Sequence, residues 1–278
     1  MSHWQWEPQQ LLPLLALGCA YAVRVRALAE RGRPVPRRRR WSFAAGLLVT
    51  ALALVSPIDW WGENRRLWVH MVQHLLLGDV APLLVILGLT GPVLRPLLAN
   101  RAVRALRPLA HPLVALPVWI GNLYLWHLPA PYQAALDHND IHALEHLCFF
   151  AFGALMWAAV IEPLPGPSWF GNGFKALYTL VVRVAGMALA MVFIWDNHPL
   201  YHYYVVREAS PVSDQRTAGL VMFTEGSIVT VLAFAWLFLR FIREMEVRQR
   251  LIDGQLDPAL AARAARYGRA ARARDVMP

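Results

Sequence analysis

Seven long apolar stretches dominate the sequence and restrict the fold more than any other feature. A helix of about 20 apolar residues crosses a bilayer core about 30 Å thick. Because backbone polar groups in lipid must be satisfied within the structure itself, such stretches are expected to be helical. They occupy residues 10–29, 41–58, 67–89, 112–128, 140–161, 176–196 and 216–240. The sequence therefore predicts an all-α polytopic membrane protein, a bundle of seven transmembrane helices.

The composition excludes several other classes of protein. Hydrophobic residues make up 57% of the chain and charged residues 16%, whereas an average soluble domain has about 45–50% and about 25%. This balance argues against a soluble enzyme, a disordered chain or a coiled coil. The two cysteines, Cys19 and Cys148, lie in separate apolar stretches and form no CxxC pattern, so neither a redox motif nor a zinc finger is expected.

The basic residues predict the orientation of the chain. There are 27 Lys and Arg residues against 18 Asp and Glu. Of the basic residues, 22 lie in alternate loops and in the C-terminal tail, and only 4 lie in the opposite loops. Because Lys and Arg concentrate in cytoplasmic loops, the N-terminus is expected outside and the C-terminus in the cytoplasm. Orientation and attraction to anionic lipid then explain the net charge, and no nucleic-acid partner is expected.

Two parts are predicted along the chain. Residues 1–243 form the seven-helix transmembrane domain, and residues 244–278 form a basic cytoplasmic tail rich in Arg and Ala. The tail is expected to be a helix that lies on the membrane surface or in solvent, with Arg263, Arg266 and Arg269 on one face.

The histidines gather at one end of the predicted bundle. His70 and His74 begin the third stretch, and His142 and His146 repeat the same four-residue step in the fifth. Residues four apart share one face of a helix, with Cβ atoms about 5–6 Å apart. Imidazole suits copper, zinc, iron and nickel. These four residues, together with His127 at the outer end of the fourth stretch, are the predicted metal or haem ligands.

Other polar residues at the same end extend the predicted site. Further candidate ligands are His138, His198, His202, Met191 and Met222. Thioether sulfur favours Cu(I), so the methionines favour copper over other metals. The residues expected to orient the ligating imidazoles are Glu145, Asp196, Asp214 and Gln215. Asp214 is also a plausible N-cap of the seventh helix.

Three ionisable residues lie within the apolar stretches, namely Asp79, Arg183 and Glu225. Ionisable groups inside a membrane are costly and are usually paired or functional. We expect these three to form a neutralising network that joins three helices, with an ion path as the alternative.

Short motifs carry a resemblance to a known family. They are H-M-V-Q-H-L-L-L at 70–77, A-P-L-L at 81–84, W-H-L-P at 126–129, Y-Q-A-A-L at 132–136, H-A-L-E-H at 142–146 and D-Q-R-T-A-G-L-V-M at 214–222. With these motifs, roughly residues 40–245 resemble the multi-span CtaG family of cytochrome c oxidase assembly proteins. The single-span, cysteine-bearing copper chaperone of the same name is not similar to this chain.

The resemblance implies a seven-span protein of the bacterial inner membrane that helps to mature a haem–copper oxidase. It implies that copper is assisted into the oxidase and that the partners are its catalytic subunit or other assembly factors, with no enzymatic activity. It also directs attention to His70, His74, His127, His142, His146 and Asp214.

Two other functions stay open at this point. The pattern at 142–146 fits an HxxEH zinc motif, so an intramembrane zinc hydrolase with Glu145 as general base is one alternative. Such a short pattern often occurs by chance, and it would leave His70 and His74 unused. Facing histidines on two helices could also hold haem in a membrane electron carrier. Without a CxxCH pattern, covalently attached haem is not expected.

Overall fold

The computed structural model describes Trp4, Trp6 and residues 8–267, and 83% of the described residues are helical. No strand occurs among the residues described, so the predicted all-α class is confirmed. Clustering of contacts divides the chain into two compact units. Unit 1 comprises residues 1–166 and 182–227, and unit 2 comprises residues 167–181 and 228–278.

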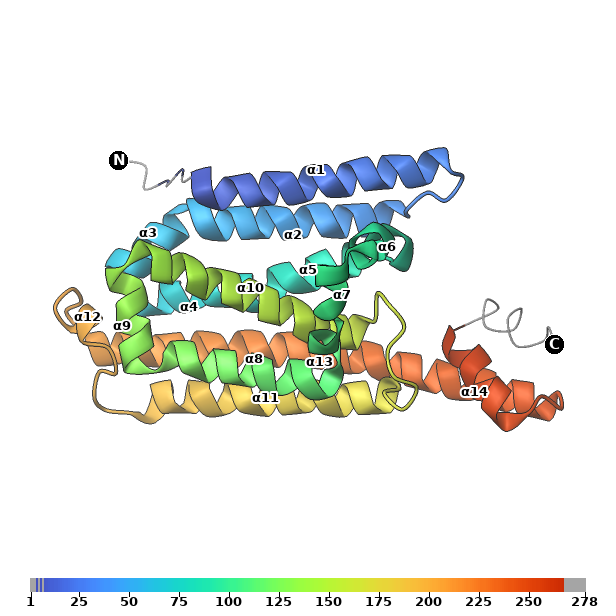
Figure 1. The fold of residues 1–278 in the computed structure, drawn as a ribbon. Coiled ribbons are helices and arrows are strands. Elements are labelled where there is room, and N and C mark those ends of the chain that lie inside the picture. Colours follow the sequence, from blue (N-terminus) through green and yellow to red (C-terminus); the bar gives the residue numbers. More distant parts are fainter. Residues whose placement is uncertain (1–3, 5, 7, 268–278) are drawn as a thin grey trace. The chain divides into compact units, whose positions relative to one another are not determined.

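Five helical segments are long and apolar enough to cross a membrane (Figure 1). They are α1 (Pro8–Glu30), the continuous segment Leu67–Gly88, α10 (Asn139–Ile161), α11 (Asn172–Trp195) and α13 (Pro211–Asp253). Two bent pairs raise the number to as many as seven, namely α2 (Arg37–Val55) with α3 (Pro57–Asn64) and α8 (Pro112–His127) with α9 (Pro129–Asp137). The chain is therefore a membrane protein with five to seven candidate spans, and the count of seven stays a prediction.

Proline explains both bends. The second predicted span, 41–58, ends early because Ser56 is extended and Pro57 begins a new helix at an angle of 44°. Proline cannot continue a preceding helix but is well suited to the first turn of the next one. The Ser56 hydroxyl also accepts a hydrogen bond from the Ile58 amide at 3.3 Å. In the same way, α9 begins at Pro129 and departs from α8 by 69°.

A π-helical turn divides the third span. Helix α4 (Leu67–Leu75) is followed by η1 (Leu76–Val80) and then by α5 (Ala81–Gly88). Pro82 has no amide hydrogen to donate to the carbonyl of Gly78 four residues earlier, and its ring would crowd that carbonyl in a regular helix. Widening of the turn accommodates the proline, and it does so directly after His74.

Helix α10 crosses this widened turn at very short range. A Cβ atom built on Gly153 would overlap the carbonyl oxygen of Gly78 and would lie 3.2 Å from Pro82 Cγ. Small residues allow helices in membranes to approach closely. Gly153 therefore sets the distance between α10 and the span that carries His70 and His74.

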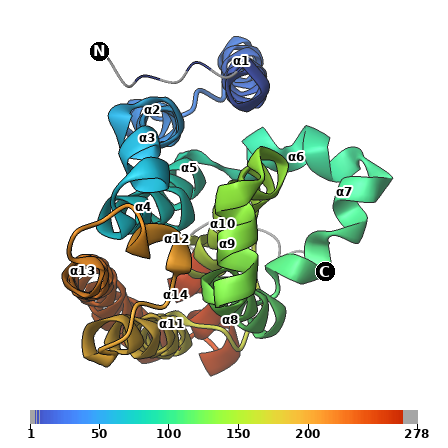
Figure 2. The same ribbon diagram turned by 90° about the vertical axis from the view of Figure 1, so that its left-hand side faces the viewer.

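The remaining helices are short, and most lie in predicted loops. They are α6 (Gly91–Ala99), α7 (Arg101–Ala105), η2 (Arg107–Ala110), α12 (His202–Val205) and α14 (Pro258–Tyr267). Figures 1 and 2 place α3, α9 and α12 at the end of unit 1 where α4 and α10 begin. Helices α6 and α7 follow the other end of the third span (Figure 1).

Helix α13 is much longer than the predicted span 216–240. It runs for 43 residues and passes position 244, the predicted start of the tail, without a break. The charged residues after 240 are good helix formers, and the helix ends only where Gly254 follows. Within unit 2, Arg266 of α14 donates to the carbonyl oxygens of Pro167, Ser168 and Phe170. Arg269 of the predicted basic face lies outside the described residues.

The core of unit 1 is rich in aromatic side chains. Its buried members include Trp126, Tyr132, Phe149, Phe193, Tyr201 and Tyr204. The rings of Tyr132 and Tyr201 stack with centroids 3.8 Å apart. This core surrounds the beginning of α4 and so immobilises the helix that carries the first histidine pair.

The close approach at Gly153 yields a stability prediction. Gly153→Ala should lower the free energy of unfolding by about 1–3 kcal/mol, because the added methyl group overpacks the crossing. Gly121→Ala is the matched control: a Cβ at that position of α8 meets nothing within 4 Å, so the better helix propensity should stabilise the chain slightly. Thermal unfolding of both variants in detergent checks this, and equal midpoints would contradict it.

Candidate metal centre

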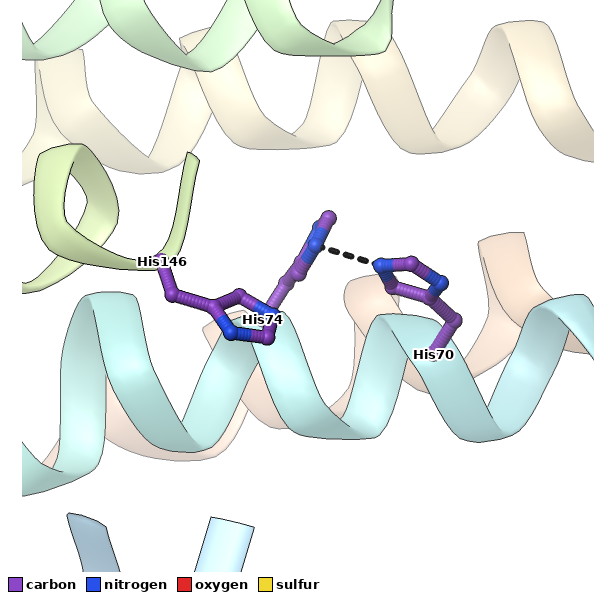
Figure 3. Close-up of side chains that lie close together, drawn as sticks. All are labelled: His70, His74 and His146. Atoms are coloured by element: carbon purple, nitrogen blue, oxygen red, sulfur yellow. Dashed lines mark hydrogen bonds between the residues drawn. The ribbon is translucent and has the colours of Figure 1, made fainter. Parts of the chain in front are cut away.

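Five histidines from three helices are buried at one end of unit 1. Helix α4 carries His70 and His74, α8 ends with His127, and α10 carries His142 and His146. Each of the five is at most 7% exposed. The pair on α4 faces the pair on α10, as the sequence pattern predicts, with ring centroids 5.3 Å apart for His70 and His142 and 6.0 Å apart for His74 and His146. Figure 3 shows His146 beside the α4 pair.

His70 and His74 point their Nε2 atoms at each other, 2.8 Å apart (Figure 3). On its other side, His70 Nδ1 lies 3.1 Å from the Tyr204 hydroxyl, which donates to the carbonyl of Gly62 at 2.7 Å. Burial raises the pKa of the Tyr204 phenol well above its ordinary value, so the hydroxyl stays protonated as that donor. The Tyr204 oxygen then accepts the Nδ1 hydrogen of His70, and the Nε2 lone pair of His70 faces His74.

His142 is held in a similar way by a carboxylate. Glu63 Oε1, at the partly exposed end of α3, lies 2.6 Å from His142 Nδ1. A carboxylate can only accept, so the Nδ1 hydrogen is donated to Glu63 and the Nε2 lone pair of His142 is left free. That Nε2 atom is buried and has no hydrogen-bond partner. Partners of this kind fix the tautomer and ring orientation of metal-ligating histidines in proteins.

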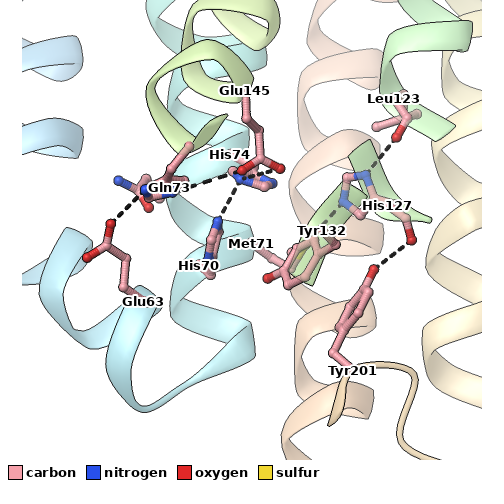
Figure 4. A network of polar contacts seen from close by, with 12 residues as sticks. Glu63, His70, Met71, Gln73, His74, Leu123, His127, Tyr132, Glu145 and Tyr201 are labelled. Carbon is pink, nitrogen blue, oxygen red and sulfur yellow. Dashed lines mark hydrogen bonds and ion pairs between the residues drawn. The ribbon is translucent and has the colours of Figure 1, made fainter. Parts of the chain in front are cut away.

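Glu145 lies between His74 and His142, and Figure 4 shows its carboxylate beside His74. Its side chain is fully buried, with Oε1 3.6 Å from His74 Nε2 and Oε2 4.0 Å from His142 Nε2. Neither carboxylate oxygen has a hydrogen-bond partner. Burial of an unpaired carboxylate is costly, so this position calls for a cation or a proton.

His146 is the most unusual of the five. Both of its ring nitrogens are buried without a hydrogen-bond partner. Buried polar groups in proteins nearly always have one, and each exception requires an explanation. Two groups of three donors have ligand atoms within 4.8 Å of one another: His70, His74 and His146 form one, and His70, His142 and Glu145 form the other.

His127 belongs to neither group of three and has a distinct environment. Its Nδ1 lies 2.7 Å from the carbonyl oxygen of Leu123, and its Nε2 lies 3.3 Å from Met71 Sδ (Figure 4). The carbonyl requires a hydrogen on Nδ1, so a neutral His127 directs the Nε2 lone pair at a sulfur that is itself an acceptor. Its ring centroid is 5.8 Å from that of His74.

A buried amide fixes the helix that carries the first pair. Gln73, between His70 and His74 in sequence, donates to the carbonyl of Ala53 at 2.9 Å and to Asp59 Oδ1 at 2.5 Å. These bonds join α4 to α2 and α3. Rotation of α4 about its axis would break both of them, so the direction of the two imidazoles is fixed.

Asp214 has a different role from the predicted one. It does not cap its own helix but accepts a hydrogen bond at 2.6 Å from the amide of Leu67, the first residue of α4. Arg66, the residue before α4, provides no capping side chain. A carboxylate at a helix N-terminus satisfies free amides and complements the helix dipole. Asp214 therefore positions α4 rather than touching an imidazole.

Gln215 likewise acts on the backbone. Its Oε1 accepts from the amide of Leu200 at 2.8 Å, and its Nε2 donates to the carbonyl of His198 at 3.3 Å. It therefore holds the loop between α11 and α12, which leads to Tyr201 and Tyr204.

Several predicted residues are not brought to the cluster. His138, His198 and His202 are exposed. His138 precedes α10 with an extended backbone (φ −136°), so the four-residue step to His142 does not place it on the helix face. Asp196 binds the amide of His198 in the same exposed loop. Met191 is half-buried, and Met222 packs in the apolar core.

The predicted intramembrane network is only partly formed. Asp79 accepts from Trp157 Nε1 at 2.6 Å and shares a hydrogen bond with Glu225. A hydrogen bond between two carboxyl groups needs a proton, so this pair can form it only with at least one group protonated.

Arg183 departs from the predicted network. It donates to the carbonyl of Phe223 at 3.1 Å and to the Ser227 hydroxyl at 2.6 Å. Among the described residues it forms no ion pair with either carboxyl group and contributes only a longer-range attraction to Glu225.

Comparison with known proteins assigns the family. Residues 19–244 match the family described as cytochrome c oxidase caa3 assembly factor, Caa3_CtaG. The chain belongs to this family. The predicted resemblance is thereby confirmed, and the family is described as one of cytochrome c oxidase assembly factors.

More distant relatives add little about function. An uncharacterized protein of Mycobacterium bovis and one of Mycobacterium tuberculosis are each 25% identical to this chain over 172 residues. The match covers 55% of this chain but only 25% of either relative, so the chain spans about a quarter of their length. No solved structure matches this family member.

Sequence reasoning missed three residues that shape the cluster: Glu63, Gln73 and Tyr204. Gln73 lies inside the H-M-V-Q-H motif, so the helical period could have placed it beside the histidines. Glu63 and Tyr204 reach the cluster from α3 and α12, which are separate short helices. Nothing in their local sequence indicates that contact.

The capping role of Asp214 can be tested by its effect on stability. Asp214→Ala should lower the free energy of unfolding by about 1–2 kcal/mol, because the amide of Leu67 at the start of α4 loses its acceptor. Asp214→Asn should cost less, since an amide oxygen still accepts one hydrogen bond. Asp196→Ala, in an exposed loop, is the control and should change stability by less than about 0.5 kcal/mol. An equal effect of Asp196→Ala would contradict the role.

Proposed function

We propose that the protein binds a copper ion as cargo at the buried imidazole cluster and transfers it to a subunit of the oxidase. The observation that carries the proposal is His146, whose two ring nitrogens are buried and without partners next to four other donor side chains. An ion held there would satisfy atoms that the protein itself leaves unsatisfied.

The donor set fits copper. Neutral imidazole nitrogens bind copper as well as zinc and iron, and the carboxylate of Glu145 offers a charged oxygen beside them. His70, His142 and Glu145 form one group of three donors. His70 also belongs to the second group, together with His74 and His146. More donors are present than one ion needs, so ligands can be exchanged one at a time, which transfer requires.

The pair formed by His127 and Met71 favours copper over zinc. The imidazole nitrogen of His127 and the thioether sulfur of Met71 lie 3.3 Å apart, and neither has a hydrogen to donate to the other. Both can act as metal ligands, and thioether sulfur prefers a soft cation such as Cu(I). We propose that this pair forms a second binding site for the copper ion, here called the second station. It adjoins the cluster, because the rings of His127 and His74 are neighbours.

Access to the cluster is proposed to pass Glu63. Its side chain is 27% exposed while that of His142, to which it binds, is 7% exposed. The distribution of basic residues supports an outward-facing cluster, with the N-terminus outside and the C-terminus in the cytoplasm of a bacterial inner membrane. The receiving partner would be the catalytic subunit of the oxidase or another assembly factor in the same bilayer.

The copper content of purified protein tests this proposal. Full-length protein produced with added copper should contain about one ion per chain, and His70→Ala or His146→Ala should lose most of it, because each removes a donor from a group of three. His198→Ala is the matched control, since that imidazole is 92% exposed and should leave the copper content unchanged. Elemental analysis with an optical spectrum measures all four proteins.

Three outcomes would overturn the proposal, and each identifies a different function. Zinc in place of copper, together with hydrolytic activity that depends on Glu145, would indicate the intramembrane hydrolase. A haem absorption band would indicate the electron carrier. Equal, substoichiometric copper in the wild-type protein and all variants would indicate that the family's assembly role does not depend on metal binding at these residues.

The second station predicts a sulfur ligand. X-ray absorption of protein loaded with Cu(I) should show sulfur scattering that Met71→Leu removes, while Met222→Leu, a buried methionine of the apolar core, should retain it. Leucine conserves the side-chain volume, so each variant should cost less than about 1.5 kcal/mol. A spectrum with nitrogen scatterers alone in the wild-type protein would rule out this station while leaving the imidazole cluster intact.

A further inference from the structure

A cavity lined by arginines lies at the other end of unit 1. Its volume is about 570 Å³, within the range of about 300–1,000 Å³ that is usual for small-molecule sites. Arg24, Arg31, Arg33 and Arg95 line it, and its other seven lining residues are Leu, Pro, Gly or Ala, with no Asp or Glu among them.

The cavity lies at the level expected for lipid headgroups. The span that carries His70 is 22 residues long from Leu67 to Gly88, or about 33 Å at 1.5 Å per residue. Helix α6 begins at Gly91, three residues beyond that end, and a Cβ built on Gly91 would lie 3.9 Å from Leu164, just after α10. The last turns of α1 and the residues just after it, Arg31 and Arg33, supply the remaining wall. Three chain segments therefore meet where spans leave the membrane.

No described acidic residue forms an ion pair with the four arginines of the cavity. Arg24 is fixed in place, with Nε and Nη2 donating to the carbonyl of Pro92 at 3.2 and 2.7 Å. Among the described residues, the side chains of Arg31, Arg33 and Arg95 have no hydrogen bond or ion pair. Four like charges around one cavity repel one another, and the N-terminus of α6 adds a further positive potential. An anion would relieve this repulsion.

We propose that this cavity binds the phosphate headgroup of an anionic phospholipid. Guanidinium groups bind phosphate through paired, charge-assisted hydrogen bonds, and basic pockets between transmembrane helices are suited to anionic headgroups. The apolar wall, which includes Leu28 and Leu164, matches the glycerol and acyl part of a lipid and gives no polar contact to a water-soluble ligand. The lipid would join α1 to α6. This proposal is independent of copper binding.

Lipid titration of the delipidated, full-length protein tests the proposal. Native mass spectrometry should detect one tightly bound cardiolipin or phosphatidylglycerol, at least 10-fold preferred over phosphatidylcholine. Arg31→Gln/Arg33→Gln should weaken cardiolipin binding about 30-fold, since each arginine near an anionic headgroup contributes about 1 kcal/mol. Neither side chain makes a contact that folding needs, so this double variant should fold normally.

The matched control removes the same charge elsewhere. Arg101→Gln/Arg104→Gln, on helix α7 and outside the cavity lining, should change cardiolipin affinity less than twofold. An equal loss in both double variants would show diffuse attraction and overturn the site. Competition by inorganic phosphate or glycerol 3-phosphate at the concentration of the lipid would also overturn it, because the ligand would then be a soluble phosphate.

Discussion

The burial of donor atoms that have no partner is the constraint on which the rest of unit 1 depends. Placing imidazoles and a carboxylate in an apolar interior is unfavourable unless they are satisfied, and here His146 and Glu145 are left unsatisfied. Such an arrangement persists only where the surroundings determine it. The bonds of Gln73, the close crossing at Gly153 and the aromatic core hold the donors together at the expense of stability.

The helical period made the centre of this site predictable. Residues four apart lie on one face, so the pairs at 70 and 74 and at 142 and 146 could be assigned to facing helices from the sequence alone. The same rule failed for His138, because the backbone there is extended and the helix has not yet begun. It also gave no information on His198 and His202. These residues lie at the same end of the spans as the cluster, but that position does not determine whether a loop side chain points toward the cluster or toward solvent.

Long-range contacts could not be predicted in this way. The carboxylate of Asp214 serves a helix that begins 147 residues earlier, and Tyr204 reaches His70 across 134 residues. Local pattern favoured an N-cap role for Asp214 in its own helix, and only the packing of α13 beside α4 in unit 1 decides otherwise. The effect of proline was not predicted either: at positions 57, 82 and 129 it produces two bends and a π-turn that set the directions of the helices around the site.

The contact between Asp214 and the start of α4 has a consequence for biosynthesis. A growing polypeptide contains all five buried histidines once residue 146 has been made, yet the carboxylate that secures the first two is added 68 residues later. The early intermediate therefore displays its imidazoles on a helix whose end is not yet capped. The secured arrangement of α4 can form only once the part of α13 that carries Asp214 has been added to the chain.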